Sequence, residues 1–416
     1  MVTTKEERAA LSSGDARPSV PSEVTLDTDL ETLNLNWSEK DLPEKQRTKH
    51  VHRLHPYLGK FIPQLVEIFL RKYFVLGQTV LDPFCGSGTT LVQANELGIN
   101  SIGCDVSAFN ILLCYVKTAP YDLTKVSKEV MDILQKTYAL TQNFSKCKFE
   151  ADYHQLSLWE EHSNAIKTFG TDNQYLKQWF ATQALRELLT YRQLIETEGY
   201  DYQTLLKIIL SRSARSARLT KHFDLDFPKQ PQVQPYWCYK HSRECHPTTE
   251  ALKFLKRYSL DTLKRLEEFS TLRTSAKVEL YHTDSREAIF PRIDGVITSP
   301  PYVGLIDYHE QHAYAYHLLG LEDKRIEEIG SAANGSSQKA QRQYQKGMAT
   351  VFQRAADALP SGGRMIVIAS DRANLYPEIA NLVGVEVEAT VQRHVNRRTG
   401  RRSSEFYESV FIWRKY

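Results

Sequence analysis

The sequence has little net charge, few cysteines and no long apolar run. Its 53 basic and 50 acidic residues leave a formal charge of +3, too small to indicate a nucleic-acid binder from the total alone. No apolar stretch approaches membrane-spanning length and the N-terminus has no signal-peptide pattern, so we expect no membrane association. Six cysteines without a regular spacing predict no disulfide framework and favour a cytoplasmic protein.

The 416 residues are enough for one large domain with an insertion. Residues 1–45 are mostly polar, which predicts a flexible N-terminal arm. Strand and helix patterns alternate over residues 46–115 and again over 276–416, which is typical of an α/β fold with a mostly parallel, seven-stranded sheet. Between them, residues 116–275 are mainly helical in pattern and predict a large helical insertion.

The stretch LDPFCGSGTT, residues 81–90, joins a predicted strand to a predicted helix. Gly86 and Gly88 let the backbone turn tightly and approach a ligand at the edge of the sheet where α/β folds bind ligands. The stretch has neither the Gly-Lys-Ser/Thr of a phosphate-binding loop nor the spacing of a dinucleotide fingerprint. Asp82 beside the turn would repel an anion and attract an ammonium group. The turn therefore predicts a ligand that carries positive charge.

Asp82, Asp105 and Asp284 each follow a predicted strand. Taken singly, each is better interpreted as the N-cap of the next helix. Taken together they match S-adenosylmethionine: Asp82 for its ammonium group, Asp105 for its ribose hydroxyls and Asp284 for its adenine amine. Three acids at three strand ends, beside the glycine turn, favour this cofactor.

The stretch TSPPY, residues 298–302, ends another predicted strand. Pro300 and Pro301 lack a backbone donor and fix the chain, so they present carbonyls rigidly and without partners. These carbonyls and the Ser299 hydroxyl would hold the hydrogens of an exocyclic base amine, while Tyr302 offers a face for stacking a flipped base. The alternative is an ordinary Pro–Pro turn after a strand.

With both motifs in place, the chain resembles the DNA amino-methyltransferases of the N4-cytosine/N6-adenine group. DPFCGSGT is similar to the cofactor motif of that family, TSPPY to its catalytic motif, and HPYLGKF (55–61) to the segment that closes over the methionine end of the cofactor. The resemblance implies a Rossmann-like S-adenosylmethionine-dependent enzyme that acts on double-stranded DNA. It implies these cofactor contacts: Tyr57, Lys60, Phe61, Asp82, Pro83, Phe84, Gly86, Gly88, Thr89, Asp105 and Asp284. It implies these catalytic residues: Ser299, Pro300, Pro301 and Tyr302.

Serine at the head of the PPY motif is typical of the cytosine-N4 enzymes, which makes N4 of cytosine the expected target. Adenine N6 as the target, RNA as the substrate and a catalytically inactive nucleic-acid-binding module are the alternatives; glycine spacing disfavours an oxidoreductase. Many SPPY enzymes place the catalytic motif before the cofactor motif, whereas here the cofactor motif comes first. The insertion also precedes Asp284, although related enzymes with this order carry their target-recognition region after it. A restriction endonuclease acting on the same site is a possible partner.

Two basic clusters are candidates for contacts to DNA phosphates, and the helical insertion is the candidate recognition region. The first cluster has a spacing of three that would form a ridge on a helix: Arg212, Arg215, Arg218 and Lys221. A solvated charged face is an equally good interpretation of that spacing. The second lies at a predicted hairpin tip: Arg397, Arg398, Arg401 and Arg402.

The segment YWCYKHSRECHP, residues 236–247, carries potential metal ligands. Cys238, His241, Cys245 and His246 have suitable chemistry, but their spacing matches no standard zinc module. His246 next to Cys245 would also strain a tetrahedral site, so we expect a buried cysteine pair or a reduced loop there, and no metal.

Overall fold

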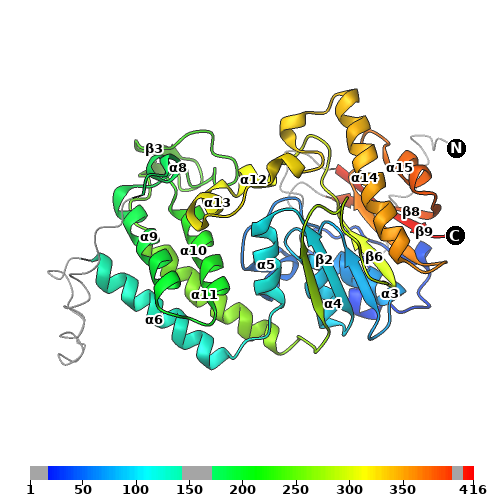
Figure 1. The fold of residues 1–416 in the computed structure, drawn as a ribbon, viewed down its shortest axis with the longest axis horizontal. Coiled ribbons are helices and arrows are strands. Elements are labelled where there is room, and N and C mark those ends of the chain that lie inside the picture. The colour runs from blue at the N-terminus through cyan, green and yellow to red at the C-terminus, as the bar shows by residue number, and fades with distance from the viewer. Residues whose placement is uncertain (1–16, 143–170, 396–405) are drawn as a thin grey trace.

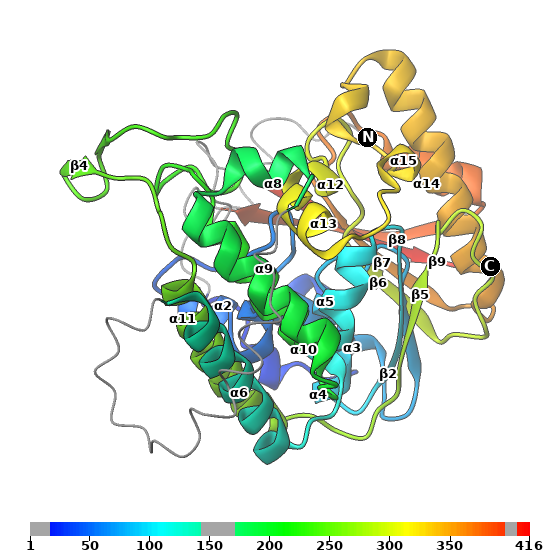
Figure 2. The same cartoon turned by 60° about the vertical axis from the view of Figure 1, so that its left-hand side comes forward.

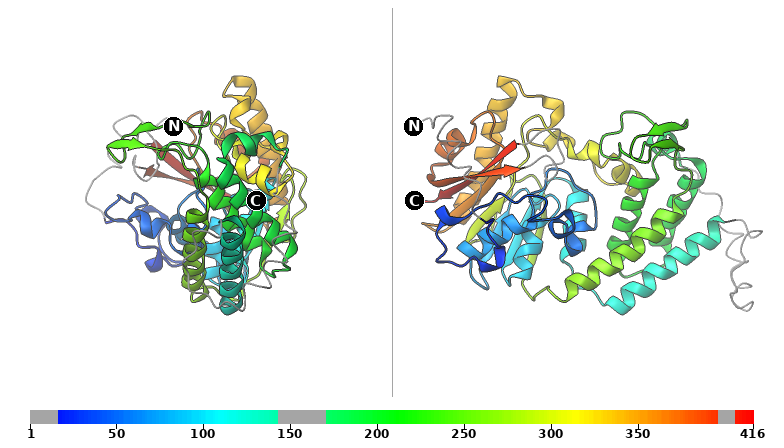
Figure 3. Two further views of the ribbon diagram at one scale, coloured as in Figure 1. Left: turned by 90° about the vertical axis from the view of Figure 1, so that its left-hand side faces the viewer. Right: turned by 180° about the vertical axis from the view of Figure 1, so that it is seen from behind.

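The computed structural model describes residues 17–142, 171–395 and 406–416. Figure 1 shows a layered sheet with helices on both faces and, beside it, a separate group of helices. The same two parts are seen from behind in Figure 3. The four arginines predicted at a hairpin tip, Arg397, Arg398, Arg401 and Arg402, lie outside the described residues.

The sheet has seven strands in the order β5-β2-β1-β6-β7-β9-β8. In that order their bounds are Val278–His282, Asn100–Asp105, Thr79–Asp82, Gly295–Thr298, Arg364–Ala369, Phe406–Arg414 and Glu386–Val395. The pairs from β5 to β7 are parallel, and β9 is antiparallel to both of its neighbours, β7 and β8. The predicted mostly parallel, seven-stranded α/β fold is confirmed.

Alternating side chains on the central strands supply two separate cores, as the two-residue period of a strand requires. Ile297 and Ile366 pack on one face with helix α3, whereas Val296 and Met365 pack on the other with helices α14 and α15. The helices around the sheet are α3 (Pro63–Tyr73), α4 (Thr89–Glu96), α5 (Ala108–Thr118), α14 (Gln338–Ala358) and α15 (Tyr376–Val383).

The insertion consists of helices that share one core with α5 and α13. Its elements are α6 (Leu123–Thr141), α8 (Gln174–Trp179), α9 (Thr182–Thr197), α10 (Gln203–Ala217), β3 (Tyr236–Cys238), β4 (Arg243–Cys245) and α11 (Leu252–Ser270). Helices α12 (Tyr308–Gln311) and α13 (Ala313–Leu319) lie between the sheet and this group (Figure 1). The insertion is therefore packed against the half of the chain that contains the sheet and does not form an isolated core.

Two helical stretches are interrupted. Helices α8 and α9 are separated at Phe180, which is extended and buried. Helix α13 ends at Gly320, whose φ of +63° is a left-handed C-cap. A loop with two short turns follows, η5 (Arg325–Glu327) and η6 (Ala332–Asn334).

The prediction of a flexible arm over residues 1–45 is wrong for residues 17–45. Leu33, Leu35, Trp37 and Leu42 are buried against α3 in the core on one face of the sheet. Burial of a few apolar side chains holds this otherwise polar segment against the sheet domain. The short elements here are η1 (Pro21–Glu23), η2 (Leu30–Thr32), α2 (Glu44–Arg47) and η3 (His50–Arg53).

Across the described residues, no helix combines the length and apolarity that crossing a membrane would require.

Candidate active site

A cavity opens where the carboxyl ends of β1, β2, β5 and β6 meet. Nine of the eleven predicted cofactor residues line it: Tyr57, Lys60, Phe61, Pro83, Phe84, Gly86, Thr89, Asp105 and Asp284. Of the predicted catalytic residues, Ser299 and Pro301 line it as well. The two predicted motifs, more than 200 residues apart in sequence, therefore meet at one cavity because β1 and β6 are neighbours in the sheet.

The glycine turn between β1 and α4 depends on two left-handed residues. Gly86 has a φ of +48° and Gly88 a φ of +75°. A Cβ atom on Gly86 would lie 2.9 Å from the Tyr57 hydroxyl oxygen, and one on Gly88 would lie 3.0 Å from the sulfur of Cys114. Gly86 lines the cavity, whereas Gly88 is the N-cap residue of α4 and does not line it. The backbone conformation and the close packing together require glycine at both positions.

Asp105, at the end of β2, holds the glycine turn from the neighbouring strand. Its Oδ2 accepts a hydrogen bond of 2.9 Å from the Gly86 amide, and its Oδ1 accepts one of 2.8 Å from the Ser107 amide. The side-chain nitrogen Nδ2 of Asn110 donates to both carboxylate oxygens at 3.1 Å. Burial raises the pKa of the Asp105 carboxyl above its usual value. The sequence analysis missed Asn110, although its place one turn into a helix capped by Ser107 is a recognisable signal.

Asp284 lies in the loop after β5 and also lines the cavity. The Nε atom of Arg286 donates to both carboxylate oxygens of Asp284, at 3.0 Å and 2.9 Å. The Arg286 amide adds a further bond of 2.9 Å to Oδ1. This pairing holds the carboxylate in one orientation beside the cavity.

Asp82 does not face the cavity, and the prediction that it meets an ammonium group there needs correction. Its carboxylate is completely buried. Oδ2 accepts a bond of 2.7 Å from the Thr90 hydroxyl, and Oδ1 accepts one of 2.6 Å from the Thr298 hydroxyl. Burial raises the pKa of Asp82 to about 6. Two hydroxyls that the sequence analysis did not consider occupy this acid, so its role is to position the strand ends.

The Ser-Pro-Pro-Tyr segment follows β6. Some of its residues line the cavity and others do not. Pro300 is buried and does not line the cavity. The Pro301 carbonyl accepts a 2.9 Å hydrogen bond from the Tyr344 hydroxyl, so the expectation of carbonyls without partners is wrong for this one. No hydrogen bond within the described residues occupies the Ser299 hydroxyl. Ser299 thus offers an available polar group at the cavity.

Tyr302 is not among the residues that line the cavity. Its hydroxyl donates a bond of 3.3 Å to Oε1 of Glu408 on β9. Glu408 in turn accepts a bond of 2.9 Å from the buried Arg393 of β8. The ring is half-buried and its polar end is held against the sheet, beside the Ser-Pro-Pro elbow.

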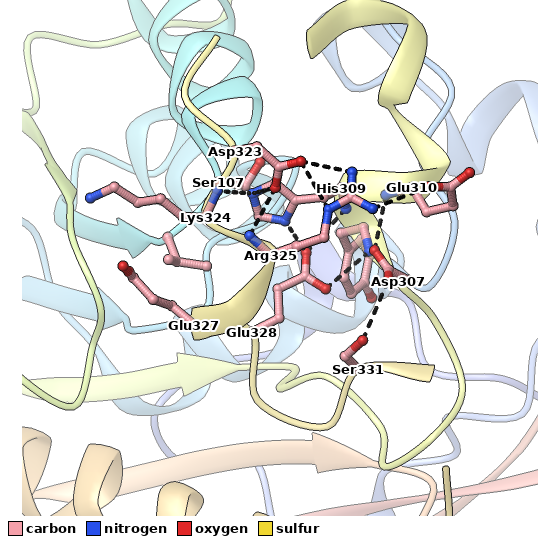
Figure 4. A network of polar contacts seen from close by, with 12 residues as sticks. Ser107, Asp307, His309, Glu310, Asp323, Lys324, Arg325, Glu327, Glu328 and Ser331 are labelled. Atoms are coloured by element: carbon pink, nitrogen blue, oxygen red, sulfur yellow. Dashed lines mark hydrogen bonds and ion pairs between the residues drawn. The ribbon is translucent and has the colours of Figure 1, made fainter. Parts of the chain in front are cut away.

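A polar network surrounds His309 and Glu328, as Figure 4 shows. Oε1 of Glu328 accepts hydrogen bonds from the amide and from Nδ1 of His309, and Oε2 accepts from the Tyr308 amide. The Lys324 amide donates 3.2 Å to Nε2 of His309, so Nε2 is the acceptor and Nδ1 carries the proton. The network fixes Glu328 at the cavity, which Glu327 also lines. No sequence motif marks these residues, which is why they were missed.

The lining suits a ligand with positive charge and several hydrogen-bond donors. Four carboxylates line the cavity, those of Asp105, Asp284, Glu327 and Glu328. Lys60, also in the lining, donates a bond of 2.9 Å to the His52 carbonyl. The buried Asn110 Oδ1 and Ser87 Oγ at this cavity have no partner within the described residues. S-adenosylmethionine, with a sulfonium, an ammonium, an amine and two hydroxyls, fits this set of acceptors.

The predicted ridge of Arg212, Arg215 and Arg218 does not face solvent. Arg212 is only 7% exposed and pairs with Asp261 at 2.7 Å. Arg218 lies 4.5 Å from the centre of the Tyr314 ring, and Arg215 pairs with Asp226. The prediction failed because α10 is enclosed by α9, α11 and α13, so its basic face meets protein. Lys221 is half-buried and lies beyond the end of α10.

Three of the four potential metal ligands of residues 236–247 lie close together. The structure brings Cys238, His241 and Cys245 together with His222, which the sequence analysis did not consider. His246, which it did consider, is exposed and is not part of this cluster.

Known proteins resemble this chain at several levels. The family model N6_N4_Mtase, described as a DNA methylase, matches residues 5–111. The type II methyltransferase M.MjaII of Methanocaldococcus jannaschii is 37% identical over 430 residues, which cover 89% of this chain and 81% of that protein. The type II methyltransferase M.BsoBI of Geobacillus stearothermophilus is 25% identical over 70% of this chain and 56% of its own length. Among solved structures, TrmN from Thermus thermophilus is 12% identical in sequence, with a TM-score of 0.31. The match covers 86% of this chain and 50% of that one.

Proposed function

Since the chain belongs to the N4/N6 family of DNA amino-methyltransferases, as 37% identity over 89% of its length establishes, we propose that it methylates the exocyclic N4 amine of a cytosine flipped out of double-stranded DNA. S-adenosylmethionine-dependent methylation of DNA follows from the family itself. The choice of cytosine rests on the serine at the head of the PPY motif. The observation that carries the site is the available Ser299 hydroxyl on the same cavity as Gly86 and Asp105.

The cofactor would be held mainly by carboxylates. Asp105 would accept from the ribose hydroxyls, since the hydrogen bonds from Gly86 and Asn110 already fix its orientation. Asp284, oriented by Arg286, would accept from the adenine amine. The bound cofactor supplies an electrophilic methyl group. The surrounding carboxylates stabilise its positive charge and leave the cavity unsuited to phosphates.

The target amine would be held by the Ser-Pro-Pro-Tyr segment. An amine attached to an aromatic ring is a weak nucleophile because its lone pair is delocalised. The Ser299 hydroxyl, which lies at the cavity, would accept one of its hydrogens and favour a pyramidal nitrogen whose lone pair points at the methyl group. Tyr302, held by Glu408, would stack on the flipped base after it enters.

The insertion is our candidate for DNA recognition. The β3–β4 hairpin projects from the helical group in Figure 2. It exposes 55% of Trp237 and 79% of Tyr239, next to Lys240 and Arg243. Aromatic rings beside basic side chains suit stacking on bases and contacts to phosphates. Arg397, Arg398, Arg401 and Arg402 remain candidates for phosphate contacts, and a restriction endonuclease of the same specificity is a proposed partner.

The direct test is transfer of a tritiated methyl group from S-adenosylmethionine to unmethylated duplex DNA, followed by mass spectrometry of the nucleosides. We expect N4-methylcytosine. N6-methyladenine would contradict the assigned base and retain the chemistry, whereas label in RNA alone would overturn the DNA assignment. Ser299→Ala is the control: it should bind the cofactor in calorimetry with unchanged affinity and transfer almost no methyl group.

A further inference from the structure

Four potential metal ligands converge at the β3–β4 hairpin, and none of them lines the cavity. Cys238 ends β3, Cys245 ends β4, His241 lies in the turn between them, and His222 comes from the loop after α10. One ligand atom from each side chain lies within 4.8 Å of all the others. Both cysteines are buried and have free thiols.

The distances match the edges of a tetrahedron around one ion. Zinc binds thiolate at about 2.3 Å and imidazole at about 2.0–2.1 Å, so a tetrahedral site needs N–N edges of about 3.3 Å and S–N edges of about 3.6 Å. The two Nδ1 atoms of His222 and His241 are 3.3 Å apart. The Nδ1 of His241 lies 3.6 Å from the Cys238 sulfur and 3.4 Å from the Cys245 sulfur. The His222 Nδ1 lies 3.9 Å from the Cys238 sulfur.

Hydrogen bonding alone does not explain this arrangement. The Nδ1 of His241 is close to three polar atoms at once, yet a neutral ring nitrogen carries either one proton or one lone pair. The two Nδ1 atoms that face each other can share at most one hydrogen. A cation at the centre of the four atoms satisfies all of them together.

The hairpin also needs a stabilising contact beyond its own core, because that core is very small. Each strand has three residues, and the buried cluster contains only Tyr236, Cys238 and Cys245. An isolated two-stranded hairpin of this size is marginal in water, and small units of this kind depend on a disulfide or a metal. The ligands from the loop after α10 and from the hairpin would be joined through the ion.

We propose that His222, Cys238, His241 and Cys245 bind one structural zinc ion. The donor set of two sulfurs and two nitrogens in a tetrahedron selects zinc, and four protein ligands leave no open position for chemistry. Binding converts both thiols to thiolates and releases their protons to solvent. The ion fixes the hairpin to the loop after α10 and so holds Trp237 and Tyr239 at the surface.

The test measures zinc in the full-length protein, purified without chelators from zinc-supplemented cells, by mass spectrometry of the metal. We expect about one zinc per chain. Cys238→Ser and His222→Ala should each lose most of it, and His246→Ala, the matched control next to Cys245, should retain it. Equal zinc in all variants, or none in the wild type even after titration with zinc, would overturn the proposal.

Two measurements on the wild type keep the test decisive if a variant fails to fold. Cobalt substitution should give the intense visible bands of a tetrahedral site and the charge-transfer absorption of two thiolates. Removal of the metal by a chelator should increase proteolysis within residues 222–246 while cofactor affinity in calorimetry stays the same. A disulfide between Cys238 and Cys245 in the native protein, detected by peptide mass spectrometry, would contradict the site.

Discussion

The Thr298 hydroxyl donates a hydrogen bond of 2.6 Å to Oδ1 of Asp82, joining the end of β6 to the end of β1. Oδ2 of the same carboxylate accepts from Thr90 in the first turn of α4. One buried acid therefore holds both the strand that leads into the Ser-Pro-Pro-Tyr segment and the helix that follows the glycine turn. Through these bonds it sets the distance between the proposed cofactor and the proposed catalytic serine.

Thr298→Val tests this link, since valine has nearly the same shape and cannot donate to Asp82. We expect a loss of about 1.5–3 kcal/mol in the free energy of unfolding, because a buried carboxylate loses one of its donors. Methyl transfer should fall more than cofactor affinity, since the serine is displaced relative to the cofactor. Urea unfolding, calorimetry and initial rates measure these three quantities.

Thr350→Val, at an exposed position on α14, is the control and should change the free energy of unfolding by less than about 0.5 kcal/mol. Unchanged stability in Thr298→Val would refute the link.

Tyr302 is expected to act through its ring. Tyr302→Ala should lower turnover roughly 5- to 150-fold, which corresponds to the 1–3 kcal/mol of one base–aromatic stack. Tyr302→Phe removes only the hydroxyl that donates to Glu408 and should cost less than about tenfold. Steady-state kinetics on one duplex substrate compares them, with the exposed Tyr138→Ala as the control. If the phenylalanine and alanine variants were equally impaired, the hydroxyl and not the ring would be essential.

Lys117 makes the stability depend on pH. Its side chain is fully buried, its Nζ donates 2.6 Å to the Ser87 carbonyl, and burial lowers its pKa from 10.5 to about 8. Between these two values the unfolded chain binds the proton and the folded chain does not, so Lys117 makes the folded state more stable as pH rises through this window.

Lys117→Met should remove that dependence. Relative to the variant, the wild type should gain up to about 3 kcal/mol between pH 7 and pH 10.5, at about 1.4 kcal/mol per pH unit. Urea unfolding of both proteins at several pH values measures the difference between their free energies of unfolding. Groups that titrate in the same way in both proteins do not contribute to this difference. Lys128→Met, on the exposed side of α6, should show no such trend. A difference independent of pH would mean that Lys117 keeps its ordinary pKa in the fold.

The arginines of α10 should matter for stability and not for DNA affinity. Arg212→Ala leaves Asp261 with Arg265 as its remaining ion-pair partner, and we expect a loss of more than about 2 kcal/mol in unfolding free energy. Arg192→Ala, which breaks a half-exposed pair with Glu196, should cost less than about 1 kcal/mol.

DNA binding at several salt concentrations separates the two basic clusters. The slope of log affinity against log salt should be the same in Arg212→Ala and the wild type. Replacing Arg397, Arg398, Arg401 and Arg402 together should flatten it, by about 0.9 for each arginine that contacts a phosphate. A changed slope in Arg212→Ala would mean that α10 contacts DNA. An unchanged slope in the quadruple variant would mean that the second cluster does not contact DNA.

Most of the fold and much of the site could be predicted because their signals are local. The succession of strand and helix patterns predicted the seven-stranded sheet, and the glycines and prolines located the two motifs at strand ends. Parallel strands bring their carboxyl ends to one edge, so the motifs were expected to meet there. Spacing also placed the arginines of α10 on one side of a helix.

Partners distant in sequence decided the rest. Asp82 was visible as an acid after a strand, but the hydroxyl that occupies it comes from Thr298, 216 residues away. The face of α10 was predicted without knowledge of the helices that cover it. Likewise His222 joins the cysteines only because the chain folds back after 16 residues. Periodicity and turn chemistry determined the elements from the sequence by itself, because they depend on neighbouring residues. Only the tertiary structure determined which polar and charged groups are buried, paired or clustered, because those properties depend on what packs against them.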